Sequence, residues 1–352
     1  MIAPRVYRGA ILGAGNIARS AHLPAFAVSR LLRERVAVVA AVDPRPAIEP
    51  LGGIPIVPRF EDLARFGPID FVDVCTATAS HVELTLRALE AGRHVLCEKP
   101  VAVDRGEAER IARAARASGR VVVPCHQYRY NPAWRQARAW LEAGRIGRWH
   151  AAEIAVVRAH ADPGAAGAPG TAGEPGAWRG RGAESRGGVL VDHGTHWIYL
   201  IQDLAGPPAG VRAWTATLRH ATYDVEDTVH LLLEYPDRVV TLFLTWAGWG
   251  RETSIRFLGE RGTVAWVGGE LILDSETGSE RRDMSRELQK SSYPYWFADL
   301  FERFVDCMDA ASGEGPSPAS EAALSDVASV AGVLERAYAS AVPEPRERAS
   351  VA

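Results

Sequence analysis

The fold is decided near the N-terminus, by the stretch Val6-Tyr7-Arg8-Gly9-Ala10-Ile11-Leu12-Gly13-Ala14-Gly15-Asn16-Ile17-Ala18. A strand-like run leads into a glycine-rich turn, and residues 21–32 have the pattern of a helix. G-x-G-x-x-A in this context is a dinucleotide-binding fingerprint: the first glycine makes the tight turn, the second admits the pyrophosphate, and Ala18 keeps the helix close to the sheet. Any tight strand-to-helix turn can carry the same letters, but the context favours a nucleotide. We therefore predict cofactor contacts at Gly13, Gly15, Asn16 and Ile17.

Further strands and helices alternate after this turn. Strand-like runs are predicted at 36–42, 70–75, 94–97 and 121–125, and helices at 80–91 and 105–117. Alternation of this kind predicts a parallel sheet covered by helices. The chain has 352 residues, which is more than one core usually supports, so two domains are expected. We predict an α/β protein whose first domain, residues 1–128, is a Rossmann dinucleotide-binding domain.

Asp43 directly follows the strand predicted at 36–42. A carboxylate there accepts hydrogen bonds from ribose hydroxyls and repels a 2′-phosphate, so NAD is favoured over NADP. Arg45 is able to pair with a 2′-phosphate and leaves NADP as the less favoured alternative. Asp43 can also be a simple turn former before Pro44, which is compatible with either cofactor.

Polar residues follow the other strands of the predicted sheet, at the edge where ligands bind. Thr76, Ala77, Glu98 and Gln127 are predicted cofactor contacts there. Ser80 is expected to cap the next helix. His81 is a weaker cofactor candidate, since it can equally be a packing histidine, and the same alternative applies to His94.

Lys99 stands out because the chain is almost free of lysine. Of its 40 basic residues only Lys99 and Lys290 are lysines. Arginine does not release its proton near neutral pH, whereas a desolvated lysine is able to. Lys99 ends a strand at the cofactor edge and is predicted to act in proton transfer. The alternative is that both lysines are remnants of a codon bias.

Overall composition narrows the class of protein. A formal charge of -3 gives no basic surface for nucleic acid or an anionic membrane. Four cysteines without a C-x-x-C pair favour buried thiols over disulfides or structural zinc. The N-terminus lacks a signal-peptide pattern, and no apolar run reaches membrane-spanning length. We expect a cytoplasmic protein whose partner is a small molecule.

A second polar motif, Asp192-His193-Gly194-Thr195-His196, follows Gly187-Gly188-Val189-Leu190-Val191. Helical residues four apart share a face, so Asp192 and His196 are expected to point into one site. A metal site is the alternative, although further ligands at matching spacing are lacking. A second alternative is purely structural: Asp192 is a carboxylate favoured by the helix dipole at the start of the helix, and His196 is a core histidine.

Together, the glycine fingerprint, Glu98-Lys99-Pro100 and the Asp192-to-His196 segment resemble the Gfo/Idh/MocA family of oxidoreductases, in order and separation along nearly the whole chain. The resemblance implies a Rossmann domain followed by a C-terminal α/β domain, here 129–345, with a large open, mainly antiparallel sheet. It also implies homodimers or homotetramers formed through that sheet. We expect no metal, because matching ligands are lacking. The family's catalytic Lys, Asp and His correspond to Lys99, Asp192 and His196, which are also expected to contact substrate.

The segment 127–132 is expected to cross between the domains. By the same resemblance, Gln127 and Arg129 contact cofactor or substrate, with a hinge hydrogen bond as the alternative. Residues 161–187 are rich in Gly, Ala and Pro and are predicted to be either a cover over the substrate pocket or a disordered insertion. Trp178 and Arg179 are expected near a polyol substrate or its acidic group.

The rest of the chain is predicted to be mainly strands, followed by two closing helices. Strands are expected at 149–160, 211–218, 228–234, 239–246, 253–258 and 263–267, and helices at 134–143, 295–310 and 321–340. Trp246, Trp249 and Trp266 make this region aromatic, which suits a subunit interface or a core equally.

These features predict an NAD(P)-dependent dehydrogenase of a sugar, amino sugar or cyclitol, acting between a secondary alcohol and a ketone. His196 is the expected proton acceptor, with Lys99 polarising the oxygen and Asp192 orienting the pair; the roles of Lys99 and His196 can be exchanged. Two alternatives are an NAD-dependent redox-assisted glycosidase and a non-catalytic NAD sensor on the same fold. The substrate, the reaction direction and the oligomer size are not fixed by the sequence.

Overall fold

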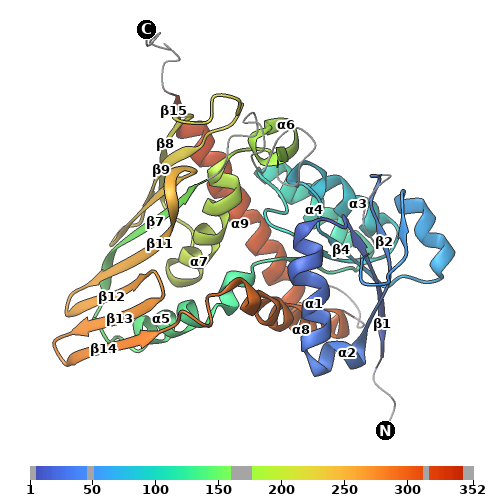
Figure 1. Ribbon diagram of the computed structural model, residues 1–352, viewed down its shortest axis with the longest axis horizontal. Coiled ribbons are helices and arrows are strands. Elements are labelled where there is room, and N and C mark those ends of the chain that lie inside the picture. The colour runs from blue at the N-terminus through green and yellow to red at the C-terminus, as the bar shows by residue number, and fades with distance from the viewer. Residues whose placement is uncertain (1–4, 46–50, 160–176, 312–316, 344–352) are drawn as a thin grey trace.

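The computed structural model contains two β-sheets with helices between and around them (Figure 1). It describes residues 5–45, 51–159, 177–311 and 317–343. The two sheets lie on opposite sides of the molecule, and the long helix α9 runs between them. No helix in the described ranges is both long and apolar enough to cross a bilayer.

The first sheet has six parallel strands in the order β3-β2-β1-β4-β5-β6. Its strands are β1 (Tyr7–Leu12), β2 (Val36–Val42), β3 (Ile56–Val57), β4 (Phe71–Val74), β5 (His94–Cys97) and β6 (Val122–Pro124). Strands β4 and β5 are buried along their whole length, as expected for parallel strands covered on both faces. The Rossmann sheet predicted from the sequence is confirmed.

Helices cover both faces of this sheet. They are α1 (Leu23–Val28), α2 (Arg30–Arg35), α3 (His81–Glu90) and α4 (Arg105–Ser118). The single helix predicted at 21–32 was wrong: a π-helical turn at Ala18–His22 precedes α1, and Ser29 interrupts the helix. The side chain of Ser29 accepts a hydrogen bond from the backbone N–H of Leu32 and caps α2.

The second sheet has nine strands in the order β14-β13-β12-β11-β7-β10-β9-β8-β15. They are β7 (Trp149–Ala159), β8 (Gly210–Ala216), β9 (Thr228–Glu234), β10 (Val239–Thr245), β11 (Ala247–Gly259), β12 (Gly262–Val267), β13 (Glu270–Ser275), β14 (Gly278–Asp283) and β15 (Val342–Pro343). Only the pairs β7–β10 and β8–β15 are parallel. The large, mainly antiparallel sheet expected here is confirmed.

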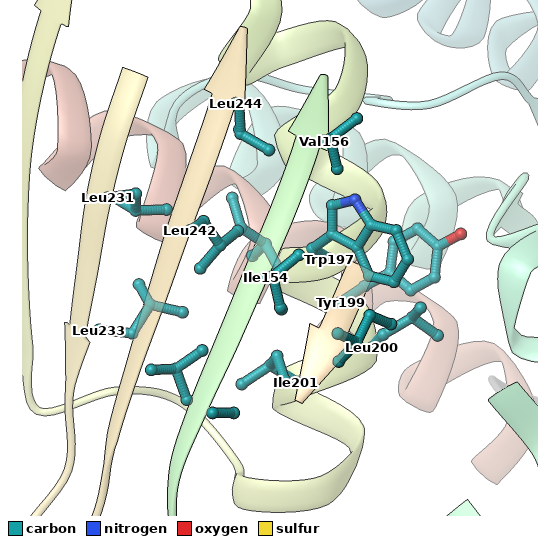
Figure 2. Packing of buried hydrophobic residues seen from close by; sticks show 14 of the residues in the cluster. Ile154, Val156, Trp197, Tyr199, Leu200, Ile201, Leu231, Leu233, Leu242 and Leu244 are labelled. Atoms are coloured by element: carbon teal, nitrogen blue, oxygen red, sulfur yellow. The ribbon is translucent and has the colours of Figure 1, made fainter. Parts of the chain in front are cut away.

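The inner face of the second sheet packs against α5 (Pro132–Glu142) and α7 (Thr195–Ala205). Figure 2 shows Ile154 and Val156 of β7 directed at Trp197 and the side chains that follow it on α7. Every residue from Thr195 to Ile201 is buried, so this helix has no free face over that stretch. The core therefore fixes the start of α7, and with it the Asp192-to-His196 segment.

The last two long helices join the two sheets. Helix α8 (Tyr293–Ala310) packs against α1 on the first sheet, where Phe297, Phe301 and Phe304 are buried. Helix α9 (Pro318–Ser340) contacts α4 and β6 on one side and α7 and β8 on the other. C-terminal helices thus complete the cover of the N-terminal sheet, and the boundary predicted at residue 128 stays a prediction.

Several local expectations differ from the structure. Strands β13 and β14 were missed: β14 is polar and is held by backbone pairing with β13, whereas β13 alternates and buries Leu271 and Leu273 in the core. Ser80 does not cap α3: its hydroxyl donates to Thr76 Oγ1 and the Ala77 carbonyl. Most of the predicted cover, residues 161–176, lies outside the described residues, and so does the tail 344–352.

Candidate active site

The glycine turn has the shape that a dinucleotide needs. Gly13 has φ +94°, and a Cβ there would lie 2.9 Å from the Cys75 carbonyl, so only glycine fits. Its N–H donates to the Val42 carbonyl at 2.8 Å and ties the turn to β2. No atom lies within 4 Å of the corresponding position on Gly15. That open side suits a pyrophosphate, so the chain's own geometry fits NAD.

Asp43 stands at the end of β2 beside this turn. Its Oδ2 accepts from the Ala14 N–H at 2.9 Å and from Arg45 Nη2 at 2.6 Å. Burial raises the pKa of Asp43, but the hydrogen bonds from Arg45 and Ala14 outweigh burial and lower the pKa overall. The carboxylate is therefore charged, and Arg45 is paired with it rather than free.

The strand-end residues pack on one another. His81 places Nδ1 2.8 Å from the Pro100 carbonyl and Nε2 3.1 Å from the Thr76 carbonyl, joining two strand-end loops. His94 is a packing histidine whose Nδ1 accepts from the Val121 N–H, and burial lowers its pKa to about 4. Cofactor contacts at Thr76, Ala77 and His81 stay predictions. Both nitrogens of His81 face backbone carbonyls, and because burial lowers its pKa, the neutral ring donates to one of them.

A buried ionic cluster beneath this edge was missed by sequence reasoning. His22 Nδ1 lies 2.8 Å from Asp73 Oδ2, and its Nε2 lies 2.9 Å from Glu98 Oε1. Ionised carboxylates only accept, so both ring nitrogens donate and His22 is an imidazolium. Burial opposes that charge, but Asp73 holds the pKa of His22 well above its ordinary value. The sequence did hold one sign of this cluster: Asp73 is a carboxylate inside an apolar strand, and a buried carboxylate needs a partner.

Donor atoms of His22, Asp73 and Cys125 lie within 4.8 Å of one another, as metal ligands could. Because His22 already donates to two carboxylates, the cluster is explained by a buried imidazolium without a metal. Glu98 also accepts the backbone N–H of Lys99 at 3.1 Å. Burial raises the pKa of Glu98, yet the hydrogen bond from His22 and the charge of His22 lower it overall. The cluster therefore anchors the residue before Lys99 in the sheet.

Lys99, which follows β5 of the first sheet, contacts Asp192, which lies just before α7 on the second sheet. Its Nζ donates to Asp192 Oδ1 at 3.0 Å and to the Asp192 carbonyl at 2.5 Å. Arg179 reaches the same carboxylate, with Nε 3.1 Å from Oδ2. Burial raises the pKa of Asp192, but the charges of Lys99 and Arg179 reverse this and lower it well below its ordinary value. Asp192 is thus an anion held between two cations.

The glycine-rich segment before Asp192 is shaped by Glu226. Its carboxylate accepts from the N–H groups of Gly188 at 3.0 Å and Leu190 at 3.1 Å, and the Tyr338 hydroxyl donates to it. A Cβ on Gly188 would lie 1.8 Å from the Glu226 carbonyl oxygen, so the close approach requires glycine. Residues Leu190–Gly194 then form a π-helical turn that leads into α7. The predicted helix begins with this wider turn.

His196 lies in the first turn of α7 and is buried. Its Nδ1 is 3.0 Å from the Tyr199 hydroxyl, and its ring stacks on Tyr128 with centroids 4.3 Å apart. Burial, then the charges of Lys99 and His193, lower the pKa of His196 well below its ordinary value. His196 is therefore a neutral imidazole close to the Lys99–Asp192 pair. Tyr199 was missed by sequence reasoning, because its role depends on contacts that only the folded chain makes. Its hydroxyl also accepts a hydrogen bond from the backbone N–H of Tyr128, 71 residues away.

The crossing between the sheets is held by Arg129. Its Nε and Nη2 donate to Asp203 at 2.7 Å each, and its Nη1 donates to Asp326 at 2.5 Å. Arg129 therefore joins α7 to α9, which argues against its predicted substrate contact. Gln127 is buried beside it, and its Oε1 has no hydrogen-bond partner in the described structure. Trp178 lies under the Arg179 guanidinium at 4.6 Å. The roles of Gln127 and Trp178 stay predictions.

Comparison with known proteins gives two family matches along the chain. Residues 7–126 match the model of an oxidoreductase family with an NAD-binding Rossmann fold, named GFO_IDH_MocA. Residues 134–265 match the GFO/IDH/MocA C-terminal domain. The two matches follow one another in the same order as the two sheets.

Individual relatives agree with this. The chain is 25% identical over 340 residues to the uncharacterized oxidoreductase YdgJ of Escherichia coli, covering 90% of this chain and 92% of that one. It is 36% identical to the 1,5-anhydro-D-fructose reductase of Ensifer adhaerens, over 40% of this chain and 39% of that one. The fold is shared with the WlbA dehydrogenase of Bordetella pertussis in complex with NADH and UDP-GlcNAcA, with TM-score 0.78, 23% identity, and 97% and 96% of the two chains covered.

Proposed function

The chain is an NAD(P)-dependent oxidoreductase of the GFO/IDH/MocA family, and we propose that it acts on a secondary alcohol of a sugar, amino sugar or cyclitol, or on the corresponding ketone. The observation that carries the proposal is the contact of Lys99 with Asp192 beside the neutral ring of His196. A reductase of a sugar derivative is among the relatives. No observation favours the glycosidase or the sensor.

Hydride transfer needs one more participant, a group that takes or gives the hydroxyl proton. NAD, when bound, accepts or donates the hydride. A neutral imidazole accepts a proton, and burial among cations makes His196 a weak base that returns it readily. When His196 holds an extra proton both its nitrogens donate, and the Tyr199 hydroxyl is placed to accept from Nδ1. His196 is therefore the proposed proton acceptor.

Lys99 and Asp192 supply charge at the reacting oxygen. The Lys99 ammonium has three N–H donors, and among the described residues its hydrogen bonds go to Asp192 alone. A donor left over is free to polarise the substrate oxygen and to stabilise negative charge that develops there. Asp192 holds the ammonium in place and balances its charge. This assignment keeps the roles predicted for the three residues.

NAD is the proposed cofactor, and NADP is the less favoured one. The charged Asp43 carboxylate accepts from the Ala14 N–H and faces the glycine turn. An acceptor there suits ribose hydroxyls, whereas a 2′-phosphate would meet a negative charge. Glu98 contributes through Lys99 and the buried cluster rather than through a free carboxylate.

Homo-oligomers through the outer face of the second sheet are proposed as the assembly. Trp246 and Trp266 are core residues, but Trp249 is 93% exposed. His230 and Phe243 stack at 4.8 Å on neighbouring strands, and the side chain of His230 is exposed. Light scattering of the purified protein tests the assembly; a monomer at micromolar concentration would contradict it. A cytoplasmic location is also proposed, supported by four buried cysteines that are all free.

Turnover is tested with a panel of polyols, cyclitols, aldoses and amino sugars, each assayed with NAD and with NADP. NADH formation from at least one secondary alcohol is expected, with NAD preferred. Cofactor binding without turnover of any compound, in either direction, would contradict the proposal. Cleavage of a glycoside without net NADH formation would point to the glycosidase instead.

A further inference from the structure

Two arginines lie opposite each other on the inner face of the second sheet. Arg158 of β7 pairs with Arg251 of β11 in the antiparallel ladder. Arg158 continues the inner stripe of Ile154 and Val156, which Figure 2 shows packed against Trp197 of α7. The stripe is apolar where it meets the helix and becomes cationic one step further along the strand. Like charges directly opposite each other destabilise a sheet, so this pair calls for a compensating partner.

The contacts of Arg158 leave its charge without a carboxylate. The side chain is buried, with the residue 8% exposed. Its Nη1 donates to the carbonyls of Val157 at 2.8 Å and Glu252 at 2.5 Å, and its Nη2 to the Thr253 hydroxyl at 2.8 Å. In the described ranges it forms no ion pair, and its buried Nε has no hydrogen-bond partner. Buried charges are ordinarily paired, so this one is incomplete within the described chain.

Arg251 is exposed and contacts the start of α8. Its Nη2 lies 3.5 Å from the Tyr293 hydroxyl, at the start of α8. Burial, and then the charge of Arg251, lower the pKa of Arg158, as expected for two cations that repel each other. An exposed guanidinium opposite a buried one offers N–H donors to an anionic ligand.

Arg158 lies within electrostatic reach of the proton-transfer residues, and Arg251 lies opposite Arg158. The charge of Asp192 acts on Arg158, and the charge of Arg158 acts on His196. The contacts above involve four cations: Lys99, Arg158, Arg179 and Arg251. In the described ranges, Lys99 and Arg179 both pair with the carboxylate of Asp192. Among the described residues named here, positive charges therefore outnumber negative ones.

Aromatic rings border the same space. Tyr128 stacks on His196, and its ring centroid lies 5.8 Å from that of Trp296. The Tyr293 ring lies 4.7 Å from Trp296, so Tyr293 connects this surface to Arg251. Flat apolar surfaces with a few polar groups placed at one end are typical of small-molecule sites. The aromatic surface suits the ring of a sugar, and the arginines suit an anionic group attached to it.

We propose that Arg158 and Arg251 bind an anionic group of the substrate, so that the alcohol which is oxidised belongs to an acidic sugar or polyol. The inference rests on the proposed function and narrows its substrate class. Carboxylate and phosphate share the chemistry that a guanidinium recognises, through paired N–H donors. The two are separated by the choice of test compounds.

The first test compares matched compounds. Binding to the complex of the enzyme with NADH is measured by calorimetry for D-glucuronate, its methyl ester and D-glucose, and for D-galacturonate and D-galactose. D-Glucose 6-phosphate is the phosphate arm. At least one anion is expected to bind about 10- to 100-fold more tightly than its neutral counterpart, the range for one charged hydrogen bond. The preference should weaken as salt is raised.

The second test uses variants. Arg251→Gln should remove most of the preference for the anion and leave binding of the neutral sugar within about threefold. Arg158→Lys keeps a charge and loses the paired donors, so it should weaken anion binding to a smaller extent. Arg281→Gln is the matched control, because Arg281 is exposed on β14 and its contact to Glu270 is long, at 3.8 Å. Circular dichroism verifies that each variant is folded.

The outcomes separate this inference from the proposed function. Equal binding of acids and neutral sugars, or a preference that survives in Arg251→Gln, would overturn the inference, while turnover of a neutral polyol would leave the proposed function intact. Anion binding that depends on Arg251, without any NADH formed from the bound acid, would uphold the arginine site and contradict the proposed reaction.

Discussion

Two buried histidines differ in charge: His22, under the first sheet, is positively charged, and His196, against the second sheet, is neutral. His22 lies between two carboxylates, and its pKa is held well above the ordinary value. His196 faces a tyrosine hydroxyl and lies among cations, and its pKa is well below the ordinary value. Burial acts in the same direction on both, so the neighbouring charges decide the difference.

The comparison shows how one residue type serves two purposes in one chain. A charged His22 donates to Asp73 Oδ2 and Glu98 Oε1 and anchors the strand end that carries Lys99. A neutral His196 is able to accept a proton where one is released. Sequence alone cannot distinguish the two, because Asp73 and Glu98 are 51 and 76 residues from His22.

The largest effect is expected for Lys99→Met. The variant should still bind NADH, because the glycine turn and Asp43 are untouched, but turnover should fall about 10²- to 10⁴-fold with loss of the charge at the reacting oxygen. Cofactor fluorescence measures binding, and NADH absorbance measures turnover. Lys290→Met, at the other lysine, is the control and should retain activity. Full turnover in Lys99→Met would refute the assignment.

His22→Leu is expected to destabilise the fold by about 3–5 kcal/mol, because it leaves two buried carboxylates without their cation. Urea unfolding followed by circular dichroism measures the loss. His94→Leu is the comparison, since His94 is also buried but neutral, and the Val121 N–H it leaves unpaired costs about 1–3 kcal/mol. Equal losses in the two variants would mean that His22 is not a charged bridge.

Tyr199→Phe removes the hydroxyl that meets His196 Nδ1 and leaves ring packing intact. Turnover should drop about tenfold, the value of one hydrogen bond of about 1.4 kcal/mol, with little change in cofactor affinity. Steady-state kinetics over a range of pH is the measurement. If kcat and its pH profile match the wild type, the Tyr199 hydroxyl does not act on His196.

The two histidines should also give opposite, smaller pH dependences of stability. A pKa raised on folding stabilises fully below the ordinary value of 6.5, and this contribution is lost as pH rises toward the folded pKa of His22. The pKa of His196 is lowered on folding, so its effect has the opposite sign. As pH drops below 6.5, His196 is protonated in the unfolded chain before it is protonated in the folded chain, and the folded state loses stability. Each slope is at most about 1.4 kcal/mol per pH unit.

Single variants test these slopes separately. His22→Asn should flatten the decline of the unfolding free energy above pH 6.5, and His196→Asn should flatten the decline below it. Urea titrations at several pH values give both slopes. An unchanged alkaline slope in His22→Asn would contradict the charge assigned to His22.

The sequence predicted the fold best where the apolar pattern of a strand is clear. The runs at 36–42, 94–97 and 228–234 became β2, β5 and β9 with the predicted ends, since a continuous or alternating apolar pattern marks such strands clearly. Strand β14, with the sequence Gly-Ser-Glu-Arg-Arg-Asp, has no apolar pattern and is held by pairing with β13. The break at Ser29 depends on its hydrogen bonds, which periodicity does not reveal.

The site was predictable in part for a similar reason. Lys99, Asp192 and His196 belong to local motifs, and the structure brings Lys99 to Asp192 with His196 beside them. Tyr199 and Arg158 belong to no motif, and their importance arises from contacts that only the folded chain creates. Arg129 lay in a suggestive segment, but its donors turn to Asp203 and Asp326.

The central claim is that a neutral His196 stands ready to take a proton beside the Lys99–Asp192 pair. Nitrogen NMR of ring-labelled histidine in the NADH complex tests it most directly, with His22→Asn and His196→Asn used to assign the signals. Near neutral pH, His22 should show two protonated ring nitrogens and His196 one. Two protonated nitrogens on His196 would contradict the claim, because that ring could not accept the hydroxyl proton.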